Sequence, residues 1–351
     1  MTYLLQFPNM KPQKPTPASI SRGFTILELM VALVVTGILA AMLLNISSGV
    51  LDTYEETTGE LDSHLQARFA LDQLTEDLQA AVSRHDGKVW LAVTVRRDEE
   101  LTGQWIGDKQ SKPQEASLSL NQDRIQDCRY GFAGVWLRLI TLSPDSLTSE
   151  TGARAVSYLI DRRPINKSNS SASDCRYTLF RGDVSPENSI EAGFNLHPVN
   201  GDYTEKGGGD SRDAGQVKNP ASENGLVDNV IDFGVRLYVK DSESTTGLRL
   251  VFPADKNGNL SNTDFEHLAT SNFEDRDDDN PDNPFSTIYP EVVDIMVRVL
   301  TRKGELAIRS FESGDTKLPP KFSSADEYWW YLAEQNSHVF VRRIKLYPSG
   351  V

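Results

Sequence analysis

The sequence predicts an α+β fold, in which a long N-terminal membrane-spanning helix packs on a predominantly antiparallel β-sheet domain. Residues 24–44 contain a single charge, Glu28, and a helix of that length matches a hydrocarbon core of about 30 Å. Apolar residues then recur at helical spacing as far as residue 84. Beyond that point several segments alternate apolar and polar residues, which is typical of half-buried strands.

The N-terminal part divides into three expected segments. Residues 1–23 form a leader with four prolines and three basic side chains, and we expect it to be unstructured. Basic residues before the apolar run keep the amino terminus in the cytoplasm. We therefore expect a single-pass inner-membrane protein whose C-terminal domain is extracytoplasmic, or periplasmic. Residues 45–84 are expected to continue the helix in amphipathic form, with an apolar stripe that a sheet would cover.

Residues 85–351 are expected to form the β-rich globular domain, with long loops near residues 161–175, 200–225 and 253–287. A hairpin is expected at Lys303-Gly304, and a further helix at Ala325–Gln335. The segments that indicate strands are Val89–Arg96, Tyr130–Leu142, Ala155–Ile160, Tyr177–Phe180, Val227–Val239, Leu248–Phe252, Val292–Leu300 and Val339–Tyr347.

The composition narrows the classes of function. A formal net charge of −14 argues against a nucleic-acid groove and against a polybasic membrane patch. The five histidines show no zinc-binding spacing, and the sequence has neither a Gly-x-Ser-x-Gly elbow nor a phosphate-binding glycine loop. We therefore expect no enzyme activity and no nucleic-acid partner.

The junction between leader and apolar run carries a specific motif. The sequence from Arg22 through Gly23, Phe24 and Glu28 to Ala32 resembles the cleavage and methylation signature of type IV prepilins and type II secretion pseudopilins. The resemblance implies a cut between Gly23 and Phe24 by a prepilin peptidase, and N-methylation of Phe24. It also implies that Glu28 meets the amino-terminal charge of a neighbouring subunit during assembly.

Three further segments are similar to the bulky minor subunits of this family, the J-type pseudopilins and W-type minor pilins. They are Arg68–Leu78 on the expected helix, Leu226–Tyr238 and the proline-led Tyr289–Val299. The resemblance implies a pilin-like fold.

Cys128 and Cys175 each lie in the tetrapeptide Asp-Cys-Arg-Tyr, next to an expected strand. In an oxidising compartment two such cysteines suggest a disulfide between neighbouring strands. Two buried free thiols are the alternative.

Calcium is the one ligand that the sequence suggests. Asp255, Asn257, Asn259 and Glu266 occupy ligand positions of a calcium-loop spacing, although Leu260 replaces the expected glycine. A second carboxylate cluster lies in residues 274–282. A solvated acidic loop without metal is the favoured alternative, and no other cofactor is expected.

These observations lead to one functional hypothesis and an alternative from another class. The hypothesis is a minor pilin or pseudopilin that joins a type IV pilus or type II secretion-like filament through its N-terminal helix, at the tip or in the priming complex. Its expected partners are the prepilin peptidase, other pilin or pseudopilin subunits, the inner-membrane assembly machinery and membrane lipid. The alternative is a surface binding module or adhesin that uses a pilin anchor for export.

Overall fold

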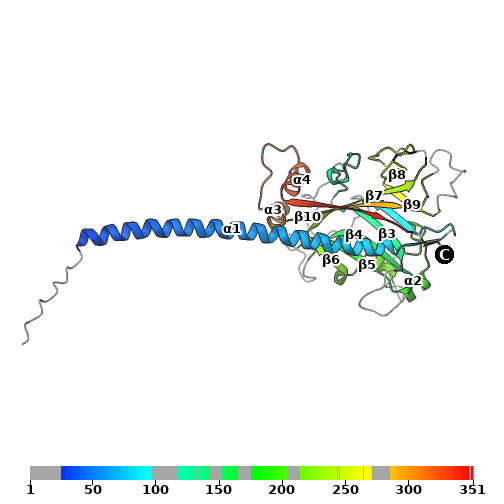
Figure 1. The fold of residues 1–351 in the computed structure, drawn as a ribbon, viewed down its shortest axis with the longest axis horizontal. Coiled ribbons are helices and arrows are strands. Elements are labelled where there is room, and N and C mark those ends of the chain that lie inside the picture. Colours follow the sequence, from blue (N-terminus) through cyan, green and yellow to red (C-terminus); the bar gives the residue numbers. More distant parts are fainter. Residues whose placement is uncertain are drawn as a thin grey trace, which may run out of the picture. The chain divides into compact units, whose positions relative to one another are not determined.

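The computed structural model describes residues 25–84, 86–96, 118–131, 133–142, 152–164, 175–203, 214–242, 244, 246–263, 265–270, 285–347 and 349–350. The chain divides into two compact units, residues 1–55 and residues 56–351. Helix α1, Ile26–Gln79, begins in the first unit and ends in the second. The mixture of a long apolar helix and antiparallel sheets confirms the predicted α+β class (Figure 1).

The second unit holds two main sheets. The six-stranded sheet has the order β6-β5-β4-β3-β2-β9, and the four-stranded sheet has the order β11-β10-β7-β8, with every neighbouring pair antiparallel. The strands are β2 (Leu91–Val95), β3 (Val135–Thr141), β4 (Arg154–Pro164), β5 (Cys175–Asp183), β6 (Gly225–Asp228), β7 (Val230–Lys240), β8 (Leu248–Phe252), β9 (Glu266–Ala269), β10 (Val292–Leu300) and β11 (Ser337–Lys345).

Shorter elements complete the second unit. Strand β1 (Val82–Ser83) pairs in parallel with β12 (Ser349–Gly350). Helix α1 ends at Gln79, before this strand, and does not reach the predicted residue 84. The remaining helices are η4 (Ile125–Asp127), α2 (Pro186–Ala192), η7 (Ala214–Val217), η8 (Ser222–Asn224), α3 (Arg302–Glu312) and α4 (Ala325–Gln335).

The last turns of α1 form part of the hydrophobic core. Ala67, Ala70, Leu74 and Leu78 are fully buried, and they join the same core as the central strands of both sheets. Their spacing of three and four residues places them on one face of the helix. The sheets therefore cover only the C-terminal part of the apolar stripe expected in this segment, Leu74 and Leu78, whereas Leu61, Leu65 and Phe69 are exposed.

The predicted hairpin at Lys303-Gly304 is wrong, because these residues lie in helix α3. Thr301 caps the helix: its hydroxyl accepts a hydrogen bond from the backbone N–H of Gly304 at 3.2 Å. Ile308 and Phe311 then fall three residues apart on the buried face. Helical spacing and a cap therefore outweigh the turn propensity of Lys-Gly.

Two other predictions need correction. The strand expected at Val227–Val239 breaks at Asn229, which has a φ of 62°, and its two parts, β6 and β7, belong to different sheets. The loop expected near residues 253–287 contains β9, which pairs with β2 at the edge of the six-stranded sheet. Helix α2 was not predicted either.

Candidate functional site

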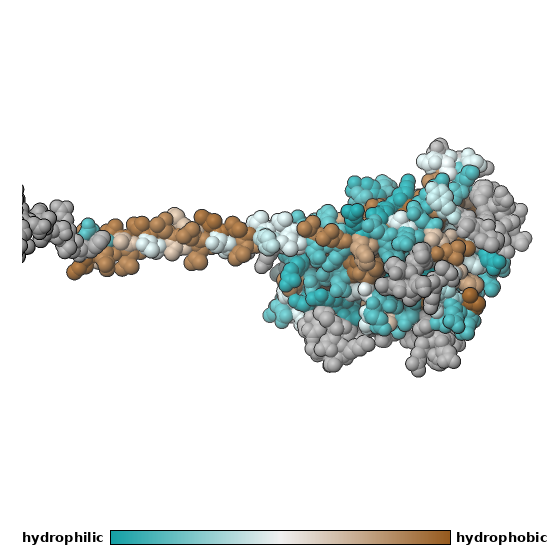
Figure 2. Space-filling model, turned by 60° about the horizontal axis from the view of Figure 1, so that its bottom comes forward, coloured by the Kyte–Doolittle hydropathy of each residue, from teal (hydrophilic) through white to brown (hydrophobic). Residues whose placement is uncertain are grey.

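The first unit presents an apolar helical surface. Residues Ile26–Leu51 have a mean hydropathy of 2.5 over their most apolar window, and none of that window is buried within the chain. Figure 2 shows apolar side chains along this part of α1. Length and composition suit a single membrane span, and this supports the expected anchor.

The start of this helix is organised around Glu28 and Thr25. The Thr25 hydroxyl accepts a hydrogen bond from the N–H of Glu28 at 3.3 Å. In return, the Glu28 carboxylate accepts from the N–H and the hydroxyl of Thr25, each at 3.1 Å. This reciprocal arrangement is a capping box, which satisfies free N–H groups at a helix start. Residues Gly23 and Phe24, expected to flank the cleavage site, lie outside the described residues.

Thr25 had no role in the prediction from the sequence. The signal was present, because Thr25-Ile26-Leu27-Glu28 has the threonine-x-x-glutamate spacing of a capping box directly before an apolar run. Glu28 is therefore held in this structure by its own helix terminus. The carboxylate is exposed, so it is also open to a second partner.

In the second unit, α1 carries a further exposed stripe. Leu61, Leu65 and Phe69 recur every fourth residue, and each is more than half exposed. They lie beside a row that contacts β11, in which Asp72 accepts a hydrogen bond from Arg342 at 2.6 Å. We name Leu61, Leu65 and Phe69 the outer stripe.

An ion cluster fastens the end of α1 to the six-stranded sheet. The fully buried Asp77 carboxylate accepts hydrogen bonds from Arg181 of β5, at 2.7 Å from Nε and 3.1 Å from Nη2. The Tyr158 hydroxyl of β4 donates to the same carboxylate. Burial, and then the Asp77 charge, raise the pKa of Tyr158 far above its ordinary value. The tyrosine thus stays a neutral donor, and the cluster fixes the helix direction.

A second buried cluster holds helices α3 and α4 on the sheet. Glu312 of α3 accepts hydrogen bonds from Arg162 Nη2 at 2.7 Å, from the Tyr177 hydroxyl at 2.5 Å and from Trp329 Nε1 at 2.9 Å. Burial is the main cause that raises the pKa of Tyr177. Because each of these donors is satisfied by the Glu312 carboxylate, we interpret the cluster as structural.

The disulfide expected between Cys128 and Cys175 is not formed in this structure, where both side chains are buried thiols. Arg236 of β7 donates from Nη2 to the Cys128 sulfur at 3.2 Å. Cys175 is the first residue of β5 and pairs with Pro164 of β4. Both strands belong to the six-stranded sheet, whereas Arg236 lies in the four-stranded sheet. The shared tetrapeptide therefore does not place the two cysteines on neighbouring strands.

The residues expected to bind calcium fall into two places. The Asp255 carboxylate accepts hydrogen bonds from the backbone N–H groups of Asn257 and Asn259, each at 2.9 Å, within one turn. Glu266 lies in β9 and accepts a hydrogen bond from the Thr94 hydroxyl at 3.3 Å. Over the described part of the chain, no group of three or more His, Cys, Asp or Glu side chains is arranged to hold a metal ion. Calcium binding stays a prediction, and residues 274–282 lie outside the described residues.

A comparison with known protein families identifies a motif near the N-terminal end of the chain. The model of the prokaryotic N-terminal methylation motif matches residues 19–44, which include Gly23, Phe24 and Glu28. The match supports a type IV pilin-like or pseudopilin-like subunit, which is a structural class of protein, and it concerns only this segment. No curated protein and no solved structure shows a significant match to the chain.

Proposed function

We propose that the chain is a minor pilin or pseudopilin. It is stored in the inner membrane by residues 24–44, is cut between Gly23 and Phe24 and exposes its second unit outside the cytoplasm. It then enters a type IV pilus or type II secretion-like filament, at the tip or in the complex that primes assembly. The observation that carries the proposal is the methylation motif at residues 19–44, followed by an exposed apolar helix whose single charge is Glu28.

Glu28 gives the proposal its mechanism. A carboxylate inside a membrane helix costs at least a few kcal/mol unless it finds a partner or reaches water. The capping box with Thr25 supplies part of that compensation within the chain. Cleavage after Gly23 would create a positive amino group at Phe24. In a low-dielectric filament core, that group on a neighbouring subunit is the natural counter-charge.

The size of the globular unit supports a minor role. Residues 56–351 form one compact unit with a continuous core. A unit of that size is difficult to repeat at the close spacing of subunits along a filament body. A terminal or priming position requires no such repetition.

The test replaces Glu28 and measures incorporation into filaments. Glu28→Gln and Glu28→Leu should leave membrane insertion, cleavage and folding of the second unit intact, because the second unit contains neither charge partner. Both should reduce incorporation at least tenfold, measured by quantitative blotting of sheared filaments and by crosslinking to co-expressed partner subunits.

Thr36→Val is the matched control. It removes a polar group from the same span, but the Thr36 hydroxyl donates to the Ala32 carbonyl of its own helix, so incorporation should stay at the wild-type level. Normal incorporation of both Glu28 variants would refute the proposed role of Glu28. A mature amino terminus other than Phe24 would refute the proposed processing.

A further inference from the structure

Strand β11 forms an edge of the four-stranded sheet, with β10 on its other side. Its backbone orientation follows from two bonds at its ends. Asn336 O accepts from Thr301 N at 2.9 Å, and Leu346 N donates to Glu291 O at 2.7 Å, so both groups point toward the β10 side. Successive residues of a strand point their N–H and C=O groups to opposite sides. The even-numbered residues of β11 therefore face β10, and Val339, Val341 and Arg343 face outward.

This outward edge is not closed by the described part of the chain. The hydrogen bonds between described backbone groups outside regular elements include none to residues 337–345. Val341 is 41% exposed, and Arg343 and Lys345 are also exposed. Natural edge strands are protected by charges, prolines or bulges. Here charges occupy only the second half, and Ser337–Val341 has no such protection.

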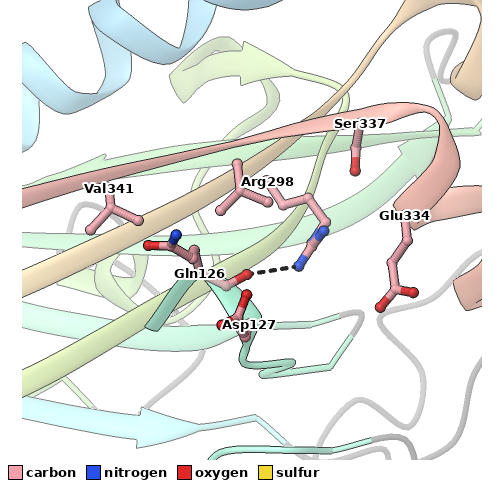
Figure 3. Close-up of a pocket in the computed structure, with 7 residues that line it drawn as sticks. Gln126, Asp127, Arg298, Glu334, Ser337 and Val341 are labelled. Atoms are coloured by element: carbon pink, nitrogen blue, oxygen red, sulfur yellow. Dashed lines mark hydrogen bonds between the residues drawn. The ribbon is translucent and has the colours of Figure 1, made fainter. Parts of the chain in front are cut away.

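A cavity of about 560 Å³ lies on one face of this edge. Figure 3 shows the Arg298 side chain of β10 reaching into it between Gln126 and Glu334, with Ser337 and Val341 above. Arg298 stands opposite Val339 in the ladder. An added strand would therefore place every second side chain over this cavity, since directly opposed residues share a face.

Arg298 is an incompletely paired cation in the wall of this cavity. The side chain is 7% exposed, its Nη2 donates to Gln126 O at 3.4 Å, and its Nε has no hydrogen-bond partner among the described residues. The Asp232 carboxylate oxygen is 4.0 Å from that Nε. Burial raises the pKa of Asp232 to about 7, so this carboxyl is only a partial counter-charge near neutrality. A buried guanidinium in this condition favours an incoming anion.

The two carboxylates at the cavity rim do not fill that need. Asp127 accepts a bidentate pair of hydrogen bonds from Arg124, at 2.7 and 3.0 Å. Glu334 accepts from Nε of Arg129 at 2.8 Å. Each rim acid is thus hydrogen-bonded to its own arginine. The Asp127 charge also acts on Arg298. Because Asp127 and Glu334 use their hydrogen bonds on other arginines, the Arg298 guanidinium keeps a donor for a negative side chain. The Ser337 hydroxyl, which has no partner within the described part of the chain, adds a donor.

On the opposite face of the same edge, Phe340 lies between His338 and Arg342, and Arg342 bonds Asp72 of α1. The Phe340 ring packs edge-on against His64 of α1, with centroids 4.9 Å apart. On the helix surface the outer stripe, Leu61, Leu65 and Phe69, lies next to this contact row and away from the core. Apolar side chains of an added strand would cover Phe340 and reach this stripe.

We propose that the free edge of β11 binds an extended segment of another filament subunit, with apolar side chains facing Phe340 and the outer stripe and a glutamate facing Arg298. Backbone hydrogen bonds to Val339, Val341 and Arg343 provide affinity, and the cavity provides selectivity. Neighbouring strands lie about 4.8 Å apart, so the added strand is roughly 10 Å from β10, and glutamate fits that reach better than aspartate. The inference rests on the proposed function for the identity of the partner only.

The experiment uses the full chain in detergent and an acetylated peptide, Thr-Val-Glu-Val-Thr, with Gln, Asp or Lys variants at the central position. Residue-resolved hydrogen exchange at millimolar peptide should show slower exchange at the Val339, Val341 and Arg343 amides. The His338, Phe340 and Arg342 amides already face β10 and should change little. The Glu peptide should bind at least tenfold more tightly than the Gln or Lys peptide, by calorimetry.

Two pairs of variants complete the test. Val341→Pro removes an outward N–H without removing a ladder bond and should abolish binding, whereas Val341→Thr keeps the N–H and should bind as wild type. In Arg298→Gln the Glu and Gln peptides should bind equally, because the charge that discriminates them is gone. Unchanged exchange at the odd-numbered amides, or equal binding by Val341→Pro, would overturn the proposal. Glu28 lies in the other unit, so failure of the proposed function would appear in its variants while peptide binding persisted.

Discussion

Asp77→Ala tests whether the buried ion cluster holds α1 on the sheet. The substitution leaves Arg181, whose side chain is 17% exposed, without one carboxylate, and it leaves the buried Tyr158 hydroxyl without its acceptor. Removal of one partner of a buried pair costs about 3–5 kcal/mol. Arg181 keeps a bond to Asp183 at 2.6 Å, so we expect the lower end, about 3 kcal/mol.

The assay is thermal unfolding of the full chain in detergent, followed by the fluorescence of the buried tryptophans. With an unfolding entropy of about 2.1 cal/mol/K per residue, a unit as large as residues 56–351 shifts by about 1.6 °C in Tm per kcal/mol, so Asp77→Ala should lower Tm by about 5 °C. Asp72→Ala is the matched control on the same helix. Asp72 also bonds an arginine, Arg342, but it is exposed, and its loss should change Tm little.

A double variant makes the reasoning refutable. The double variant Asp77→Leu with Arg181→Met replaces the pair by apolar groups. Its loss of unfolding free energy should be smaller, by at least about 1 kcal/mol, than the summed losses of the single variants Asp77→Leu and Arg181→Met. Additive costs would mean that the two side chains do not stabilise each other. A loss below about 1 kcal/mol in Asp77→Ala would mean that packing alone positions the helix.

Three other predictions concern separate parts of the chain. Gly23→Leu should leave uncleaved protein in the membrane, because a bulky side chain blocks the peptidase at the junction; intact mass and N-terminal sequencing of the membrane fraction would show this, and normal cleavage would contradict it. Burial raises the pKa of Asp232 from 3.8 to about 7, so the folded state binds more protons between these values and the free energy of unfolding should fall as pH rises from about 4 to 7, by up to roughly 4 kcal/mol. Asp232→Asn should flatten that pH dependence in denaturant titrations, and an unchanged profile would assign it to other groups. Gly304→Ala should destabilise the protein by about 1–3 kcal/mol, because its Cβ would lie 2.5 Å from the backbone oxygen of Asn336; Lys303→Ala, one residue away, serves as the control in the same titration.

The periodicity of apolar residues predicted those elements that pack through a regular repeat and do not depend on one particular neighbour. Helix α4 coincides with the predicted Ala325–Gln335, and β10 with Val292–Leu300, because each has a strong repeat and clear ends. At Lys303-Gly304 the prediction failed for a tertiary reason. Gly304 is required by the close approach of Asn336, which the sequence does not reveal, and not by a turn.

The residues of the candidate sites were also predictable only where their signal lies within one segment of the sequence. Glu28 and its anchor could be predicted because a charge in an apolar run is visible in one segment. The cavity around Arg298 combines η4, α4 and two paired strands that are far apart in sequence. Only strand register places Arg298 opposite Val339, and register depends on long-range pairing. At Cys128 and Cys175 the error was of the opposite kind. The identical local sequences suggested that the two cysteines lie on neighbouring strands and form a disulfide, which the structure does not show.

Asn229 has a mechanical consequence. Its left-handed backbone passes one continuous stretch of chain from β6 in the six-stranded sheet to β7 in the four-stranded sheet. The buried face of α1 belongs to one core with strands of both sheets, and Asp77 also ties the helix to the first sheet through Arg181. A pulling force that enters along α1 is therefore shared by both sheets, and the covalent link at Asn229 resists their sliding past each other. Under tension, the second unit would therefore unfold as a whole, and the six-stranded sheet would not first separate from the four-stranded sheet.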